Sequence, residues 1–173
     1  MKHVKKVREV MDDIFDYPHL PYWFSLGQAI KILKKTLPGT DVCTYPRGIL
    51  IFDERYNLLG TLNIRDILRG LDPKFKTVSS ETPAAVEDDT TVASIAAGLY
   101  GDESKQLLDR PVSDFMVPAN VFLEPDDPVT KAAYLMLRHN LIFVPVLEGK
   151  KRLIGIVKVI KVFDEITYVV MQE

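Results

Sequence analysis

Two short stretches of the sequence place polar side chains just after a glycine that interrupts an apolar strand pattern. In the first stretch, Gly60 is followed by Asn63, Arg65 and Asp66, where a helical pattern begins. A carboxylate accepts hydrogen bonds and the N–H groups at a helix start attract anions, so these residues could bind a polar ligand. The spacing also fits a helix cap, with Asn63 as the N-cap and Asp66 completing a capping box. Both roles stay open, and one residue can serve both.

The second stretch follows Gly155 and carries different chemistry. Lys158 and Lys161 stand where Asn63 and Asp66 stand in the first stretch. Lysine donates hydrogen bonds and cannot accept them, so this stretch could neutralise phosphates but could not accept hydrogen bonds from ligand hydroxyls. Two solvated lysines are the plainer interpretation. A glycine inside a strand weakens it unless something must approach closely, so its presence in both stretches indicates a packing requirement.

Other residue types that can do chemistry are not arranged for catalysis or metal binding. The three histidines lie far apart and lack metal-ligand spacing: His3, His19 and His139. Cys43 lies in a Pro- and Gly-containing stretch with no predicted base nearby. An acidic cluster near the start is more typical of a solvated face: Asp12, Asp13 and Asp16. The aromatic run 17–24 could cover a flat ligand ring, but it is more typical of a core or a dimer contact. We therefore predict no catalytic residues and no metal site.

The polar stretches belong to a unit that occurs twice. Val7–Met11 returns as Val112–Met116, and the strand–glycine–helix pattern around Gly60 returns around Gly155. The first copy is longer mainly because of the stretch 37–47, whose prolines and glycine mark it as a loop. A unit repeated once is too short for a solenoid, so we expect two halves that bury each other's apolar faces.

Apolar spacing predicts the elements that position these residues. Ser25 is a candidate N-cap for a helix with Leu26, Ala29, Ile30 and Leu33 inward, and Asp127-Pro128 opens the equivalent helix of the second copy. Residues 49–52 and 141–146 are predicted to be buried strands that end at polar turns. Between the copies, residues 72–89 are predicted to be a loop, followed by a helix from Val92 that ends at Gly101 and a short helix from Asp102 to Leu108.

Composition narrows the class of protein. The chain has 173 residues, of which 47% are hydrophobic and 27% charged, as in globular proteins that are soluble. A net charge of −2 and a pI of about 5.9 argue against a nucleic-acid binder. One cysteine fits a reducing compartment, and neither a secretory signal nor a membrane span is predicted. We expect a cytoplasmic protein.

The repeated unit resembles the CBS domain, and the tandem arrangement resembles a Bateman module. The resemblance rests on the Met11 and Met116 entry motifs, on Phe143-Val144-Pro145-Val146 and on the two glycine-containing junctions. It implies an α+β fold with two β-α-β-β-α repeats related by a pseudo-twofold axis. The repeats span residues 1–71 and 110–173, with a polar loop and helical linker at 72–109. It also implies a ligand cleft between the halves.

The resemblance carries expectations for individual residues. The family pattern is roughly Gly-x-x-Thr/Ser-x-x-Asp, in which the hydroxyl residue and the helix start face phosphate and the acid binds ribose. Asp66 matches the acid, and Asn63 replaces the hydroxyl residue. In the second copy Lys158 and Lys161 depart from this pattern. Pro145 belongs to the separate Phe143-Val144-Pro145-Val146 resemblance, and its counterpart in the first copy is Leu50. The expected ligand-binding residues are therefore Gly60, Asn63, Arg65, Asp66, Pro145, Lys158 and Lys161.

These residues lead to two functional hypotheses. The first is a non-enzymatic regulatory module that binds AMP, ADP or ATP, or with less support S-adenosylmethionine, between the repeats and signals to an effector protein. The alternative is a ligand-free interaction scaffold with degraded pockets, which the Lys158 and Lys161 substitutions favour. We also expect a homodimer that covers the helices opening at Ser25 and Asp127.

Overall fold

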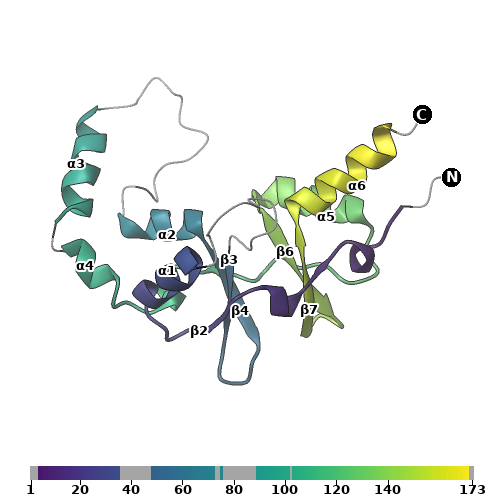
Figure 1. Ribbon diagram of the computed structural model, residues 1–173, viewed down its shortest axis with the longest axis horizontal. Coiled ribbons are helices and arrows are strands. Elements are labelled where there is room, and N and C mark those ends of the chain that lie inside the picture. The colour runs from purple at the N-terminus through teal and green to yellow at the C-terminus, as the bar shows by residue number, and fades with distance from the viewer. Residues whose placement is uncertain (1–3, 36–47, 73–74, 76–88, 102, 172–173) are drawn as a thin grey trace. The chain divides into compact units, whose positions relative to one another are not determined.

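The computed structural model describes residues 4–35, 48–72, 75, 89–101 and 103–171; for residues 89–92 and 103 it describes the backbone alone. These residues form two compact units. We call residues 18–53 and 59–118 the first-repeat unit, and residues 1–17, 54–58 and 119–173 the second-repeat unit. Figure 1 shows the helices and strands of both units.

The first-repeat unit is built on a four-stranded sheet. Its strands lie in the order β2 (His19–Pro21), β3 (Gly48–Phe52), β4 (Leu58–Asn63) and β5 (Val117–Pro118). β2 runs parallel to β3, and β4 runs antiparallel to β5. The helices are α1 (Leu26–Lys35), α2 (Ile64–Leu71), α3 (Asp89–Leu99) and α4 (Glu103–Leu107). Helix α1 follows Ser25, whose hydroxyl accepts a hydrogen bond from Gln28 N at 3.3 Å, so the predicted N-cap is confirmed.

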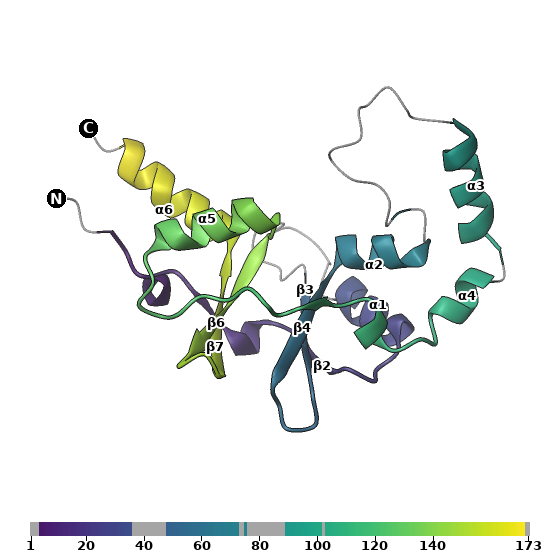
Figure 2. The same cartoon turned by 180° about the vertical axis from the view of Figure 1, so that it is seen from behind.

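The second-repeat unit has a three-stranded sheet in the order β1 (Asp12–Asp13), β7 (Arg152–Lys158) and β6 (Phe143–Glu148). A parallel bridge between Leu123 and Val146 corresponds to the β2–β3 pair of the other unit. Helices α5 (Val129–His139) and α6 (Val159–Met171) lie side by side, as Figures 1 and 2 both show. α5 is followed by Asn140, its C-cap, which adopts the left-handed conformation common at helix C-termini.

The two units exchange their entry motifs. Val7, from the start of the chain, is fully buried in the core of the second-repeat unit, beside Leu123 and Val144. Val112 and Phe115, from the second entry motif, are buried in the core of the first-repeat unit. Each motif thus completes the core of the other copy, so neither core is made from one contiguous repeat.

The two strand glycines make this exchange possible. A Cβ on Gly155 would lie 2.7 Å from Met11 Sδ and 2.9 Å from the Asp12 carbonyl oxygen. A Cβ on Gly60 would lie 2.5 Å from the Val117 carbonyl oxygen and 3.0 Å from Met116 Sδ. Real side chains essentially never approach this closely, so only glycine fits where an entry segment crosses the strand. The packing requirement predicted from the sequence is confirmed.

The α+β class and the β-α-β-β-α order are confirmed in both copies, with the first strand of the second copy reduced to the Leu123–Val146 bridge. The two linker helices are also present, as α3 and α4. The stretch 37–47 with Cys43, and most of 72–89, lie outside the described residues. The repeat boundaries 1–71 and 110–173 describe the repeat in the sequence and stay a prediction. The compact units have other boundaries, because each unit contains the entry motif of the other copy.

Candidate functional site

The first junction, where β4 passes into α2, holds a complete capping box. Asp66 N donates to Asn63 Oδ1 at 3.0 Å, and Asn63 N donates to Asp66 Oδ2 at 2.9 Å. The capping role predicted for these two residues is therefore confirmed. A carboxylate has two oxygens and about four acceptor sites, so a bond through Oδ2 leaves capacity for a further donor.

Asp66 is one of two buried acidic residues in the described ranges, with only 6% of its surface exposed; the other is Asp72 at 7%, just after the end of α2. Burial raises the pKa of the Asp66 carboxyl, while the hydrogen bond from Asn63 and the positive charges of Arg69 and Arg65 act in the opposite direction. Burial outweighs these, because removing a carboxylate from water disfavours its charged form. Perturbed pKa values cluster at functional sites, so the buried Asp66 carboxyl is a candidate ligand-binding group.

The other residues predicted for the first junction surround Asp66 along the chain. Arg65 is exposed in the first turn of α2, and Gly60 is buried in β4 against the entry segment. The structure thus brings Gly60, Asn63, Arg65 and Asp66 to one strand–helix junction. Gly60 has a packing role there, and a ligand role for any of the four remains a prediction.

The second junction, where β7 passes into α6, is arranged differently. Lys158 Nζ lies 2.7 Å from Asp12 Oδ2, and the two side chains are only 16% and 18% exposed. Asp12 Oδ2 makes no directed hydrogen bond in the described residues, so the contact is an ion pair. Lys161, in the first turn of α6, is exposed. The solvated interpretation therefore fits Lys161 but is wrong for Lys158, and Asp12 does not belong to a solvated face.

Tyr17 lies in the same unit and is 5% exposed. Its ring packs against Phe143 at a tilted angle, with 6.1 Å between centroids. Its hydroxyl is buried without a hydrogen-bond partner in the described part of the chain. Burial and the charges of Asp12 and Asp16 raise the pKa of Tyr17 well above its usual range, so the phenol stays protonated. Tyr17 is a core residue, one of the two outcomes expected for the aromatic run.

Pro145 is buried in β6, opposite Ile156 of β7. Its carbonyl oxygen accepts a hydrogen bond from Leu123 N at 2.9 Å. The counterpart in the first copy, Leu50, donates its own N–H to the Pro18 carbonyl oxygen at 3.0 Å. Proline has no N–H, so the proline of the family pattern would lose this bond in β3. The hydrogen bond from the Leu50 N–H thus explains why the first copy has a residue other than proline at this position.

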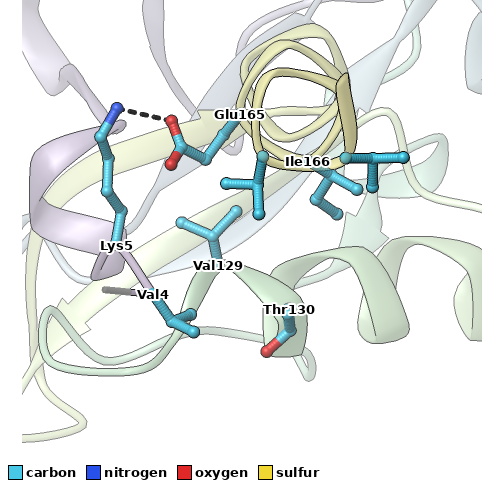
Figure 3. Close-up of a pocket in the computed structure, with 8 residues that line it drawn as sticks. Val4, Lys5, Val129, Thr130, Glu165 and Ile166 are labelled. Atoms are coloured by element: carbon cyan, nitrogen blue, oxygen red, sulfur yellow. Dashed lines mark hydrogen bonds and ion pairs between the residues drawn. The ribbon is translucent and has the colours of Figure 1, made fainter. Parts of the chain in front are cut away.

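A separate pocket opens between the N-terminal segment, the start of α5 and the later turns of α6 (Figure 3). Its volume is about 130 Å³, and its lining is mostly apolar, including Val4, Val129 and Ile166. Lys5 and Glu165 form an ion pair of 2.5 Å beside it. Sites for drug-sized ligands usually occupy about 300–1,000 Å³, so this pocket is too small for a nucleotide. It contains none of the predicted site residues.

Two further findings apply to the described ranges only. No group of three or more His, Cys, Asp or Glu side chains in them is placed to hold a metal ion. None of their helices combines the length and apolar character that crossing a bilayer requires.

Comparison with known proteins shows a match to one family model and to several solved structures. Residues 112–168 match the family model of the CBS domain. Among solved structures, CBSX2 from Arabidopsis thaliana in complex with AMP is 18% identical, with 95% of this chain and 97% of that chain covered and a TM-score of 0.63. The chain has the fold of a tandem CBS-domain pair. The resemblance predicted from the sequence is thereby confirmed.

Other CBS structures are similar over nearly the whole chain. A CBS domain-containing protein from Bacillus anthracis is 17% identical over 95% of this chain and 94% of that chain, with a TM-score of 0.65. The cytosolic domain of the Mg²⁺ channel MgtE in complex with ATP is 20% identical over 92% of this chain and 48% of that chain, with a TM-score of 0.58. Comparison with curated proteins yields no match. At these identities, the comparisons establish the fold of the CBS pair.

Sequence reasoning missed one member of the second junction, Asp12. Its partner Lys158 lies near the other end of the chain, and Asp12 reaches it because β1 pairs with β7. The one available signal was the position of Asp12 directly after the Met11 entry motif, since Met11 packs on Gly155.

Proposed function

We propose that this CBS pair is a non-enzymatic regulatory module that binds an adenine nucleotide at the first junction. Asp66 would accept hydrogen bonds from the ribose hydroxyls, and Asn63 with the start of α2 would lie near phosphate. Arg65, exposed in the first turn, supplies a positive charge suited to a phosphate. The observation that carries the proposal is the buried Asp66 carboxylate at the start of α2.

The fold gives independent support. CBSX2 and the MgtE cytosolic domain share this fold and are complexes with AMP and ATP, respectively. S-adenosylmethionine is a weaker candidate because it lacks a phosphate for the helix start. An effector protein that responds to the ligand and a cytoplasmic location complete the proposal.

A thermal-shift and calorimetry series tests it with AMP, ADP, ATP, S-adenosylmethionine and cyclic nucleotides. A ligand that binds only the folded chain at ~100 times its dissociation constant adds ~2.7 kcal/mol of stability. For a domain of this size the melting temperature should rise by roughly 5–10 °C. No shift and no heat with millimolar adenine nucleotides would contradict the proposal.

That negative outcome would favour the second candidate, a ligand-free interaction scaffold. The specific observation behind it is the Lys158–Asp12 ion pair, which satisfies the lysine at the second junction without any ligand. Purified protein that carries no nucleotide by mass spectrometry, together with a specific protein partner, would support this candidate.

We also propose a homodimer. Its interface would be formed by helices α5 and α6 instead of α1 and α5, the two helices that open at Ser25 and Asp127. The apolar face of α1 is already buried within the first-repeat unit, through Leu26, Ala29 and Leu33. Helices α5 and α6 expose large apolar side chains, including Leu137 at 83% and Val170 at 75%. Covering them would fit an interface of roughly 1,200–2,000 Å². Light scattering that gives the monomer mass of 19.6 kDa at tens of micromolar would contradict this.

A further inference from the structure

The Lys158–Asp12 pair follows directly from how β1 lies on β7. β1 runs antiparallel to β7, with Asp12 opposite Ile156. Lys158 is two residues further along β7, so it lies on the same face of the sheet as Ile156. A diagonal neighbour of this kind is within reach of a long side chain. Lys158 Nζ accordingly meets Asp12 Oδ2 at 2.7 Å, in a place where both side chains are mostly shielded from water.

Each member of this pair depends on the other. A charge removed from water is costly unless an opposite charge compensates it. Asp12 Oδ2 is buried without a directed hydrogen bond, so the Lys158 ammonium is its main compensation in the described residues. A phosphate that approached Lys158 would have to displace Asp12, leaving that carboxylate uncompensated, or lie beside it, where two anions repel.

The neighbouring groups do not alter the charge compensation between Asp12 and Lys158. Asp13 and Asp16 are exposed and carry the same sign of charge as Asp12. Tyr17 contributes a neutral phenol. Lys161 is exposed, so water compensates its charge without a counter-anion. Lys158 is therefore the shielded cation at this junction, and its counter-charge comes from the chain itself.

We propose that Asp12 is a built-in counter-anion that holds Lys158 in place of a ligand phosphate and closes the second junction to free polyphosphates. The pair makes the two halves of the molecule unequal. A phosphate-bearing ligand is confined to the first junction, and substitution of Asp12 opens a second anion site. The identity of the excluded ligand rests on the proposed function, whereas the ion pair and its exclusion of anions do not.

The test uses inorganic tripolyphosphate, an anion with neither adenine nor ribose, titrated by calorimetry into the full chain. The variant is Asp12→Asn, and the matched control is Asp13→Asn, which makes the same charge change at the next residue. Asp13 Oδ1 accepts from Phe15 N at 2.9 Å, and asparagine can keep that cap. Asp12→Asn should bind tripolyphosphate at least ~10-fold more tightly than the control, the scale of one hydrogen bond to a charged group. The double variant Asp12→Asn, Lys158→Gln should return to the control level.

Affinity of Asp12→Asn within twofold of the Asp13→Asn control would overturn the inference. If circular dichroism shows that Asp12→Asn is unfolded, the wild-type chain supplies a second measurement. The ¹⁵Nζ resonance of Lys158 should not shift with millimolar tripolyphosphate, and a shift would overturn the inference.

AMP and ATP titrations of the same wild-type protein keep the two proposals apart. Wild-type chain that binds no nucleotide, with a tripolyphosphate gain in Asp12→Asn, removes the proposed function and leaves this inference standing. Wild-type chain that binds nucleotide, with no gain in tripolyphosphate affinity in Asp12→Asn, supports the proposed function and overturns this inference.

Discussion

Replacing Asp66 by asparagine separates its two roles, the helix cap and the proposed ribose contact. One bond of the capping box runs from the backbone N–H of residue 66 to Asn63 Oδ1 and survives the change. The other, from Asn63 N to Asp66 Oδ2, can still form with an amide oxygen but loses its charge. Hydrogen bonds to charged groups contribute about 1.5–3 kcal/mol and neutral ones about 0.5–1.5, so the loss is about 1 kcal/mol.

An opposing effect reduces that loss. The carboxylate is buried, and burial raises its pKa because the charged form is less well solvated. Asparagine removes this cost. The free energy of unfolding without ligand should therefore change by less than about 1 kcal/mol, as measured by urea denaturation.

The effect on ligand binding should be larger. An amide is a neutral acceptor, so each hydrogen bond from a ribose hydroxyl should lose about 1 kcal/mol, as in the capping box. With two hydroxyls bound, affinity should weaken by about 1.5–3 kcal/mol, or roughly 10- to 150-fold. Calorimetric titration with AMP and ATP measures this. Asp164→Asn, at an exposed position of α6, makes the same chemical change and should leave affinity unaltered. Unchanged affinity in Asp66→Asn, together with a large loss of unliganded stability, would show that Asp66 is only a cap.

Three further predictions follow from the same structure. Because the pKa of Asp66 is raised on folding, its favourable contribution is complete below the unfolded-state pKa and is lost as pH rises through the folded-state pKa. The stability of wild type relative to Asp66→Asn should thus fall as pH rises above about 4, the ordinary pKa of an aspartate, and urea curves with a flat or rising difference would contradict this. Gly155→Ala should destabilise by about 1–3 kcal/mol because the new Cβ meets Met11 Sδ and the Asp12 carbonyl, whereas Gly101→Ala, with no contact below 3.4 Å, should change little. Val7→Ala removes two methyl groups from a fully buried site and should cost roughly 1.5–3 kcal/mol by denaturant unfolding; a cost below about 0.5 kcal/mol would mean that Val7 is not part of that core.

The helices could be predicted because their information is local. Leu26, Ala29 and Leu33 recur at helical spacing behind Ser25, and all three are buried on one face of α1. The packing requirement at the two strand glycines could also be predicted, because Gly60 and Gly155 each interrupt an otherwise apolar run. In these cases the cause of the structure lies within a few residues of its effect.

The short strands and the second junction could not be predicted because their causes are distant. β2 is three residues long, ends at Pro21 and lies inside the aromatic run 17–24, so its extended form depends on pairing with β3. Asp12 looks like one member of an acidic surface cluster until β1 is placed on β7. Pairing between opposite ends of a chain leaves no periodic trace in either segment.

The exchange of entry motifs has a consequence for synthesis and for dissection of the chain. Val7 is synthesised well before its neighbours Val144 and Val157, so its segment cannot be buried in this core until they have been made. The core of the first-repeat unit likewise stays incomplete until Val112 and Phe115 emerge. Cleavage within the linker 72–109 would give two fragments. Each would expose its own entry motif without the core that buries it, and each would lack the entry motif that completes its core. Such fragments should associate with each other when co-expressed, because each carries the piece that the other needs.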